Sequence, residues 1–175
     1  MIIGNKSEFA IEYELAADYG GVWMFGMICY YIKGKQIGDY ELGTSLRDVM
    51  FHIHKKIRDN GKRIHEELFH LSKFDLFNRL NEVLYGYKDS EYEEVGLKEM
   101  WARFDIVPRV DIFDESKVFL VEDKNQSRIV FKEGLSQGLR GIHEAYITKG
   151  AFDRVIFETY KQLDNIYDLE LMKQP

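Results

Sequence analysis

The sequence contains one cysteine and two prolines among its 175 residues. A single cysteine excludes a disulfide-stapled fold, and the apolar neighbours of Cys29 predict a small buried thiol. Pro108 and Pro175 mark no linker, and no Gly/Ser-rich stretch, repeat or low-complexity tract divides the chain. Because 45% of the residues are hydrophobic, the chain can bury one sizeable core. We therefore expect a single domain over residues 1–175.

Long hydrophobic runs are also missing. No stretch approaches the roughly 18 consecutive apolar residues that a membrane-spanning helix needs. The N-terminal sequence "MIIGNKSEFA" is not a basic segment followed by a long apolar run, which a secretory signal would require. These absences predict a cytoplasmic protein without a membrane partner.

Known catalytic and cofactor-binding motifs are absent. The chain contains no G-x-S-x-G, P-loop, G-x-G-x-x-G, H-E-x-x-H or C-x-x-C sequence. His52 and His54 stand two residues apart and point in nearly opposite directions on a helix, whereas helical metal ligands need a spacing of three or four. We interpret Asp105, Asp111 and Asp114 as solvated acids, with a divalent-ion site as the alternative if a turn gathers them. The sequence predicts no metal, no cofactor and no enzyme.

Basic residues are outnumbered by acidic ones. The chain has 30 acidic and 24 basic residues, and its formal net charge of -6 disfavours direct binding to nucleic acid. Five bases lie between Lys55 and Arg63, which we interpret as a solvated helix face, and four acids lie between Asp89 and Glu94. We expect a bipolar charge distribution.

The first elements that the sequence predicts are strands. Residues 8–15, "EFAIEYEL", alternate between apolar and mostly acidic side chains, which is typical of a half-exposed strand. Residues 22–32, "VWMFGMICYYI", are apolar on both faces of a strand, so each face must be covered. A short third strand over residues 37–42 completes an antiparallel meander.

Capping residues then predict two helices. Thr44 or Ser45 is expected to cap a helix that stops at Gly61. Ser72, with an acid three residues later, is expected to cap a second helix that ends at Gly86. An acidic loop follows the second helix.

The rest of the chain reads as strands followed by one amphipathic helix. The strand predictions are "MWARFDIV" (100–107), "KVFLVED" (117–123), "SRIVFK" (127–132) and "EAYITK" (144–149). The helix prediction covers residues 151–167. This order of elements predicts the α+β class, with a mainly antiparallel β-sheet and about three α-helices packed on one face.

The second face of this predicted sheet mixes aromatic and charged side chains. Alternation places Trp101, Arg103 and Asp105 there, together with Trp23 and Phe25. Such a mixture suits a protein interface, because Trp, Tyr and Arg supply much of the binding energy of interfaces. The alternative is that a loop, or the segment 86–99, covers Trp23 and Phe25.

Six segments of the chain carry a family resemblance: "MIIGNKSEFAIEYEL", "YGGVWMFG", "IGDYELGTSLRDV", "MWARFDIVPRVDIFD", "KVFLVED" and "FDRVIFETYKQL". In order and spacing they resemble the immunity protein 42 family of bacterial polymorphic toxin systems, over residues 1–50, 100–131 and 150–163. The resemblance implies a non-enzymatic bacterial protein of the cytoplasm that binds and neutralises a cognate toxin domain, delivered by contact or secretion. An acidic chain without catalytic motifs agrees with this, since it complements a basic toxin cleft such as that of a nuclease.

We therefore hypothesise a tight 1:1 inhibitor that occludes the toxin with acidic loops around aromatic anchors. Nanomolar binding corresponds to roughly -12 kcal/mol and needs a few buried anchors as well as charge steering. The predicted toxin-binding residues are Tyr87, Asp89, Glu91, Tyr92, Glu93, Glu94, Trp101, Asp111, Asp114 and Glu115.

Two alternatives from other functional classes stay open at this point. One is an acidic scaffold that self-associates through the second sheet face, for instance as a homodimer, which light scattering tests. The other is a small metal-dependent hydrolase or nuclease that uses Asp105, Asp111 and His143, which metal analysis of the purified protein tests.

Overall fold

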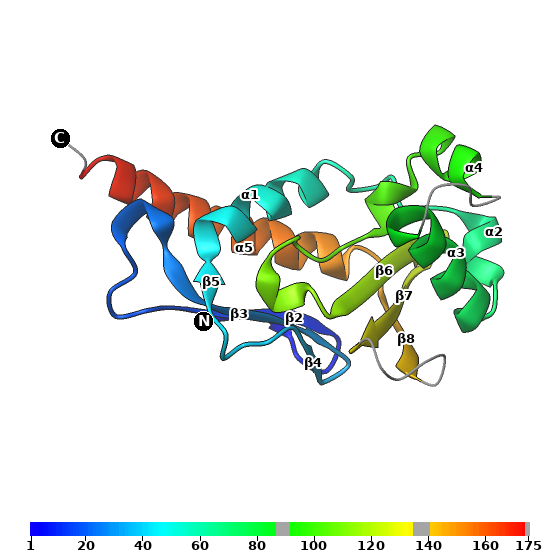
Figure 1. Ribbon diagram of the computed structural model, residues 1–175, viewed down its shortest axis with the longest axis horizontal. Helices are drawn as coiled ribbons and strands as arrows, with labels where there is room; N and C mark the ends of the chain where they lie inside the picture. The colour runs from blue at the N-terminus through cyan, green and yellow to red at the C-terminus, as the bar shows by residue number, and fades with distance from the viewer. Residues whose placement is uncertain (87–91, 135–140, 174–175) are drawn as a thin grey trace. The chain divides into compact units, whose positions relative to one another are not determined.

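The computed structural model describes residues 1–86, 92–134 and 141–173 (Figure 1). Its contacts divide the chain into two compact units. Unit 1 comprises Met1–Arg58, Pro108–Asp114 and Gly150–Pro175, and unit 2 comprises Asp59–Val107 and Glu115–Lys149. Each unit is assembled from segments that are distant in the sequence, and the single domain over residues 1–175 stays a prediction.

Unit 1 contains a five-stranded sheet whose neighbouring strands pair antiparallel. The strands follow the order β1-β2-β3-β4, and β5 also pairs with β3. Their bounds are β1 (Ile2–Asn5), β2 (Phe9–Leu15), β3 (Phe25–Ile32), β4 (Lys35–Ile37) and β5 (Thr44–Ser45). The meander predicted for the first part of the chain is confirmed.

One face of this sheet is fully apolar. The alternation of β2 turns Phe9, Ile11 and Tyr13 to the same side, and all three side chains are buried, as the pattern of residues 8–15 predicts. Their cross-strand partners on β3 are Ile32, Tyr30 and Ile28, which are buried as well.

The apolar stretch at residues 22–32 is a strand only from Phe25 onward. Residues Gly21–Trp23 form a 3-10 turn (η1), and Met24 adopts a left-handed φ of 53°, which interrupts the extended backbone. Trp23 and Phe25 keep 48% and 47% of their surface exposed. This favours an exposed, interface-like surface over the alternative that a loop or segment covers them. Cys29 is buried, and burial raises the pKa of its thiol to about 11, which makes it a packing residue.

The helix α1 (Leu46–Ile57) begins where the capping pattern predicts. The Ser45 Oγ accepts a hydrogen bond from the Asp48 backbone N–H at 3.2 Å. The helix ends at Ile57, three residues before the end that the predicted stop at Gly61 implies.

The long helix α5 (Ala151–Leu171) confirms the last helix prediction and runs four residues further. Its Phe152 ring lies 5.2 Å from the Phe9 ring, and the Tyr13 hydroxyl donates to Gln162 Oε1 at 2.9 Å. α5 therefore packs on the apolar face of the sheet. α1 lies beside α5 (Figure 1).

Unit 2 contains a three-stranded antiparallel sheet in the order β6-β7-β8. Its strands β6 (Ser116–Glu122), β7 (Gln126–Glu133) and β8 (Ile142–Thr148) confirm three of the four later strand predictions. The Asp123 carboxylate accepts from the backbone N–H groups of Asn125 and Gln126, both at 2.7 Å. These bonds close the turn between β6 and β7.

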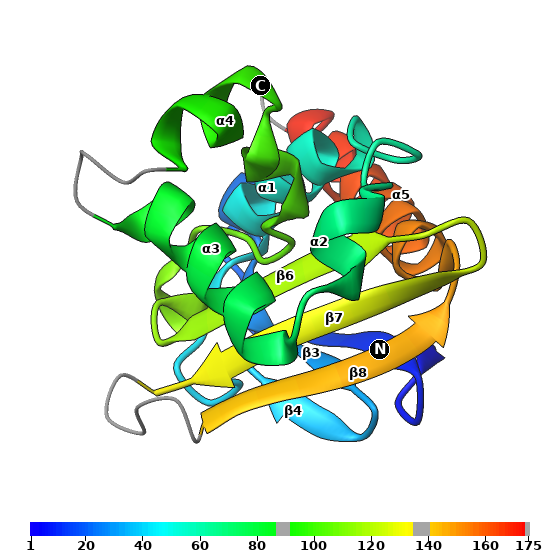
Figure 2. The same ribbon diagram turned by 90° about the vertical axis from the view of Figure 1, so that its right-hand side faces the viewer.

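Helices α2 (Glu66–His70) and α3 (Lys73–Tyr85) lie across one face of that sheet (Figure 2). α3 begins after its predicted cap, because the Ser72 Oγ accepts from the Asp75 backbone N–H at 3.1 Å, and it ends before Gly86. The core between helices and sheet consists of Leu68, Phe69, Leu76, Phe77, Leu80, Trp101, Phe104, Phe119, Val121, Val130 and Ile142.

The strand predicted over residues 100–107 is wrong. Residues Trp101–Phe104 form a 3-10 turn (η2), which follows a left-handed φ of 54° at Met100. The three-residue spacing of that turn brings Trp101 and Phe104 to the same side, into the core. Trp101 and Asp105 are therefore buried where alternation predicted exposure, and Met100 is exposed where it predicted burial.

Three further predictions are corrected. The third strand of the meander, predicted over residues 37–42, lies earlier as β4 (Lys35–Ile37), so only Ile37 of the predicted range is in a strand. The acidic segment before Trp101 contains a short helix, α4 (Glu93–Lys98), rather than only a loop. Arg63 does not lie on a solvated face: it is fully buried, and its Nε donates to the Arg103 carbonyl at 2.9 Å.

The α+β class is confirmed, with antiparallel strands and helices on a sheet face in each unit. The strands form two sheets, and the parts of the chain that the structure describes contain five α-helices. Within those same residues, none of the helices is long and apolar enough to cross a membrane.

Candidate protein-binding site

The structure brings together only some of the residues predicted to bind the toxin. Tyr92, Glu93, Glu94 and Trp101 lie on or next to α4 in unit 2. Tyr87, Asp89 and Glu91 fall outside the described residues. We name the surface formed by α4 and the residues up to Met100 the α4 surface.

The remaining predicted acids are exposed but lie on other segments. Asp111 begins the 3-10 turn η3 (Asp111–Phe113) of unit 1, and Asp114 follows that turn. Glu115 directly precedes β6 in unit 2. Of the predicted acids that the structure describes, only Glu93 and Glu94 lie on the α4 surface.

The α4 surface combines acidic side chains with exposed apolar ones. Glu94 is exposed and Glu93 is half-buried, and Val95 beside them is 43% exposed. Leu97 is 71% exposed and Met100 is 67% exposed, values that are high for residues of this size. A short helix that shows Leu and Met together with carboxylates suits contact with another protein.

Gly96 holds α4 close to the rest of unit 2. A Cβ atom at this position would lie 2.3 Å from Val83 Cγ1 of α3 and 3.4 Å from Trp101 Cε3. Trp101 is only 3% exposed, so it supports α4 from beneath and presents little surface to a partner. The structure gives Trp101 a packing role, and a toxin contact through Trp101 stays a prediction.

Substituting Gly96 with alanine tests this packing. We expect a loss of about 1–3 kcal/mol in the free energy of unfolding, because the added methyl group overlaps the branched side chain of Val83, which must leave its preferred rotamer or shift to make room. The double variant Gly96→Ala, Val83→Ala should recover most of that loss, since it removes the opposing methyl groups. Urea unfolding of Gly96→Ala, Val83→Ala and the double variant measures these losses. A double variant that loses as much stability as the two single variants together would contradict the assigned contact.

A carboxylate fixes the C-terminal side of α4. Glu99 Oε2 accepts from Trp101 Nε1 at 2.9 Å and contacts His65 Nε2 at 3.0 Å. These bonds, that of Trp101 first, lower the pKa of the Glu99 carboxyl below its usual range. The other ring nitrogen of His65 accepts from the Leu68 backbone N–H at 3.2 Å and caps α2. No motif in the sequence signals a histidine cap, so sequence reasoning missed this link.

Two of the candidate hydrolase residues, Asp105 and His143, lie in unit 2 and make packing and hydrogen-bond contacts there. Asp105 is buried and accepts from the Tyr85 hydroxyl at 2.7 Å, and the exposed His143 stacks on Phe131 at 5.4 Å. Within residues 1–86, 92–134 and 141–173, no group of three His, Cys, Asp or Glu side chains is placed to hold a metal ion.

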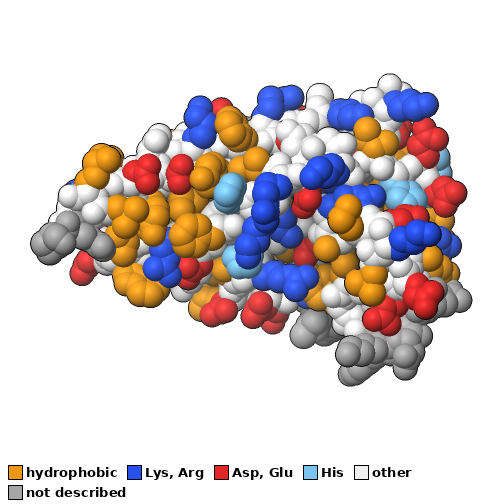
Figure 3. All heavy atoms as spheres, turned by 90° about the horizontal axis from the view of Figure 1, so that it is seen from above, with side chains coloured by type: hydrophobic (Ala, Val, Ile, Leu, Met, Phe, Trp, Pro, Cys, Tyr) orange, Lys and Arg blue, Asp and Glu red, His pale blue; other side chains and the backbone are white. Residues whose placement is uncertain are grey.

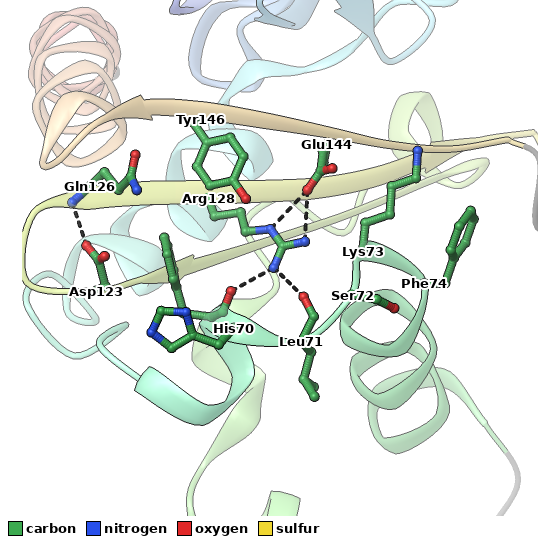
Figure 4. Close-up of a pocket in the computed structure, with 11 residues that line it drawn as sticks. His70, Leu71, Ser72, Lys73, Phe74, Asp123, Gln126, Arg128, Glu144 and Tyr146 are labelled. Carbon is green, nitrogen blue, oxygen red and sulfur yellow. Dashed lines mark hydrogen bonds and ion pairs between the residues drawn. The ribbon is translucent and has the colours of Figure 1, made fainter.

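Unit 2 also has an open pocket of about 720 Å³ between the α2–α3 connection and the sheet (Figure 4). Arg128 lies at its centre, with its Nη1 donating to the carbonyl groups of Phe69 and Leu71, each at 2.7 Å. Its Nε and Nη2 contact Glu144 Oε2 at 3.1 and 2.8 Å. The guanidinium is thus used to join α2 to the sheet, and we assign the pocket a structural role.

Known proteins are similar to this chain in sequence and in fold. A sequence profile of the family described as immunity protein 42 matches residues 1–162. The fold is similar to that of CdiI from Burkholderia dolosa AUO158, a crystal structure, with a TM-score of 0.73 and 18% sequence identity, over 93% of this chain and 99% of that chain. No protein with a curated description matches the chain. The profile match includes residues of both units.

Proposed function

The chain belongs to the immunity protein 42 family, and we propose that it neutralises its cognate toxin by holding the toxin domain in a tight 1:1 complex. A member of this family is a non-enzymatic inhibitor, so the protection it gives depends on affinity and on the rate of association. We place this encounter in the bacterial cytoplasm. Occlusion by binding needs no metal, cofactor or nucleic acid.

The α4 surface is the observation that carries this proposal. Its exposed Leu97 and Met100 can be buried by a partner, while Glu93 and Glu94 lie beside them as charges at the rim. Buried apolar anchors slow dissociation, and rim charges speed association with a complementary partner. A toxin that acts at few copies requires both properties.

The charge of the chain indicates the chemistry of the toxin. A net charge of -6 and an acidic α4 surface complement a face rich in Lys and Arg. Toxins that cleave nucleic acid need such a face, because they must bind phosphates. We therefore propose a basic toxin, with a nuclease as the first candidate. Asp111, Asp114 and Glu115 are proposed to contribute to the steering field.

Reversing Glu93 and Glu94 to lysine tests the site. We expect association with the toxin domain to slow about tenfold at low salt, with a smaller effect at high salt, because rim charges act through steering. Stopped-flow or surface binding kinetics with the toxin domain encoded by the adjacent gene measures the rate. Protection of cells that express this toxin should weaken in parallel.

The chain offers a matched control in Glu66→Lys, Glu67→Lys. These two acids also occupy the first turn of a short helix in unit 2, so the net charge and the helix context change equally. The proposal requires the control to bind nearly as fast as the unmodified chain. Equal slowing of both variants would mean that only net charge matters, and would remove the α4 surface from the account.

A further inference from the structure

Apolar side chains also gather on unit 1, over the C-terminal half of α5 and the start of α1 (Figure 3). Trp23 and Phe25 are exposed there to 48% and 47%, and Phe51 and Leu171 are similarly exposed. With Tyr167 and Arg47 they form what we name the aromatic strip. A contiguous exposed group of large apolar side chains marks an interaction site.

One end of the aromatic strip is a stack of three side chains. The rings of Trp23 and Phe25 are nearly parallel, at 5°, with centroids 6.3 Å apart. The Arg47 guanidinium lies 3.9 Å from the Trp23 ring centroid, and its Nε and Nη2 donate to Asp48 Oδ1 at 3.0 and 2.9 Å. These contacts order the side chains before any partner binds, which lowers the entropic cost of association.

The strip continues from α1 onto α5 without a break. Phe51 stands one helical turn after Arg47, and its ring lies 5.8 Å from that of Tyr167 in an edge-to-face contact. Leu171 stands one turn after Tyr167 on the same helix. Trp, Tyr and Arg, which the strip combines, are the residues most enriched at the energetic centres of interfaces.

The charges around the aromatic strip favour a basic partner. Acidic residues within one helical turn of the strip outnumber basic ones by four to three: Asp48, Asp164, Asp168 and Glu170 against Arg47, Lys55 and Lys173. Arg47 is ion-paired with Asp48, and Lys173 is ion-paired with the buried Glu170. Outside these two pairs, Asp164 and Asp168 stand against Lys55, so the apolar centre has a rim with a small excess of acidic charge.

We propose that the aromatic strip is a second docking surface for the toxin domain, and that it takes a Lys- and Arg-bearing face with an apolar depression. The proposal rests on the proposed function, since it gives the same partner a contact on unit 1. A second copy of this chain fits less well. In a two-fold dimer both copies would carry the formal net charge of -6, so their overall charges would repel each other.

The test uses Trp23→Ala and Phe51→Ala in the full chain. Isothermal titration calorimetry with the toxin domain encoded by the adjacent gene should show the Kd raised at least about 30-fold by Trp23→Ala, as at an interface hot spot. Phe51→Ala should raise it at least about tenfold. Both side chains are about half exposed, so circular dichroism should show both variants folded.

Phe157→Ala is the matched control. Phe157 is an aromatic residue of α5 with 46% exposure, and a lysine, Lys161, lies 5.6 Å from its ring, but it stands outside the strip. It should change the Kd less than threefold. Folded Trp23→Ala and Phe51→Ala variants that bind like Phe157→Ala would overturn the second docking surface. So would a dimer of the unmodified chain that Trp23→Ala dissociates while toxin binding is unchanged.

The outcomes separate this inference from the proposed function. If the unmodified chain binds the toxin domain and only the strip variants lose affinity, both statements hold. If the unmodified chain binds and the strip variants bind equally well, the aromatic strip is excluded but the immunity complex stands. If the unmodified chain does not bind, the 1:1 complex itself is contradicted, and the second docking surface with it.

Discussion

Arg128→Met should lower the free energy of unfolding by about 2–4 kcal/mol, because it removes a buried guanidinium that donates to two carbonyl groups and a carboxylate. The Arg128 side chain is 5% exposed and joins three elements of unit 2. Its loss leaves the carbonyl groups of Phe69 and Leu71, at the C-terminal end of α2, without the donor that they have in the native protein. The carboxylate of Glu144 would lose its guanidinium partner as well.

The measurement is urea unfolding at neutral pH, with Glu144→Gln as the control. The Glu144 side chain is 34% exposed, so solvent screens it, and its neutralisation should cost about 1 kcal/mol or less. Arg128→Lys should behave like the methionine variant, since an ammonium cannot reach two carbonyl groups and a carboxylate with the geometry of a guanidinium. A loss below 1 kcal/mol for Arg128→Met would show that the pocket is not held together by this residue.

Gly26→Ala should cost about 3 kcal/mol or more, as a close approach of two strands leaves no space for a side chain. A Cβ atom at Gly26 would lie 2.2 Å from the carbonyl oxygen of Glu14 and 2.9 Å from Leu46 Cδ1. Backbone atoms of β2 cannot move away as a side chain can. β2 and β3 would have to separate where Leu15 pairs with Gly26, directly after Phe25 of the aromatic strip.

Gly34→Ala separates this close contact from general backbone strain. Gly34 has a φ of +83°, and no atom lies within 4 Å of a Cβ built there. Its substitution should therefore lower the free energy of unfolding only by the strain of a left-handed alanine, about 1–2 kcal/mol. Equal losses for both variants in thermal or urea unfolding would contradict the assigned contact between Gly26 and β2.

Local signals in the sequence predict much of this fold. The caps at Ser45 and Ser72 locate α1 and α3, because a capping hydrogen bond involves only residues within one turn. The alternation of residues 9–15 predicts which side chains of β2 are buried, because successive side chains of a strand point to opposite faces.

Other features depend on contacts between distant residues and could not be predicted in this way. Alternation fails at Trp101 because a left-handed Met100 starts a 3-10 turn, and the packing of α4 against Val83 depends on Gly96, thirteen residues later in the chain. Charge indicated Glu93 and Glu94 as site residues, but only the three-dimensional arrangement shows Leu97 and Met100 beside them. The aromatic strip combines three distant segments, so the sequence left the exposure of Trp23 open.

The most direct test of the central claim is to co-express this chain with the toxin domain encoded by the adjacent gene. The molar mass of the purified product is then measured by light scattering. We expect survival of the cells and a complex that contains one copy of each chain, with a Kd in the nanomolar range or below. Dead cells and two separate species would contradict it.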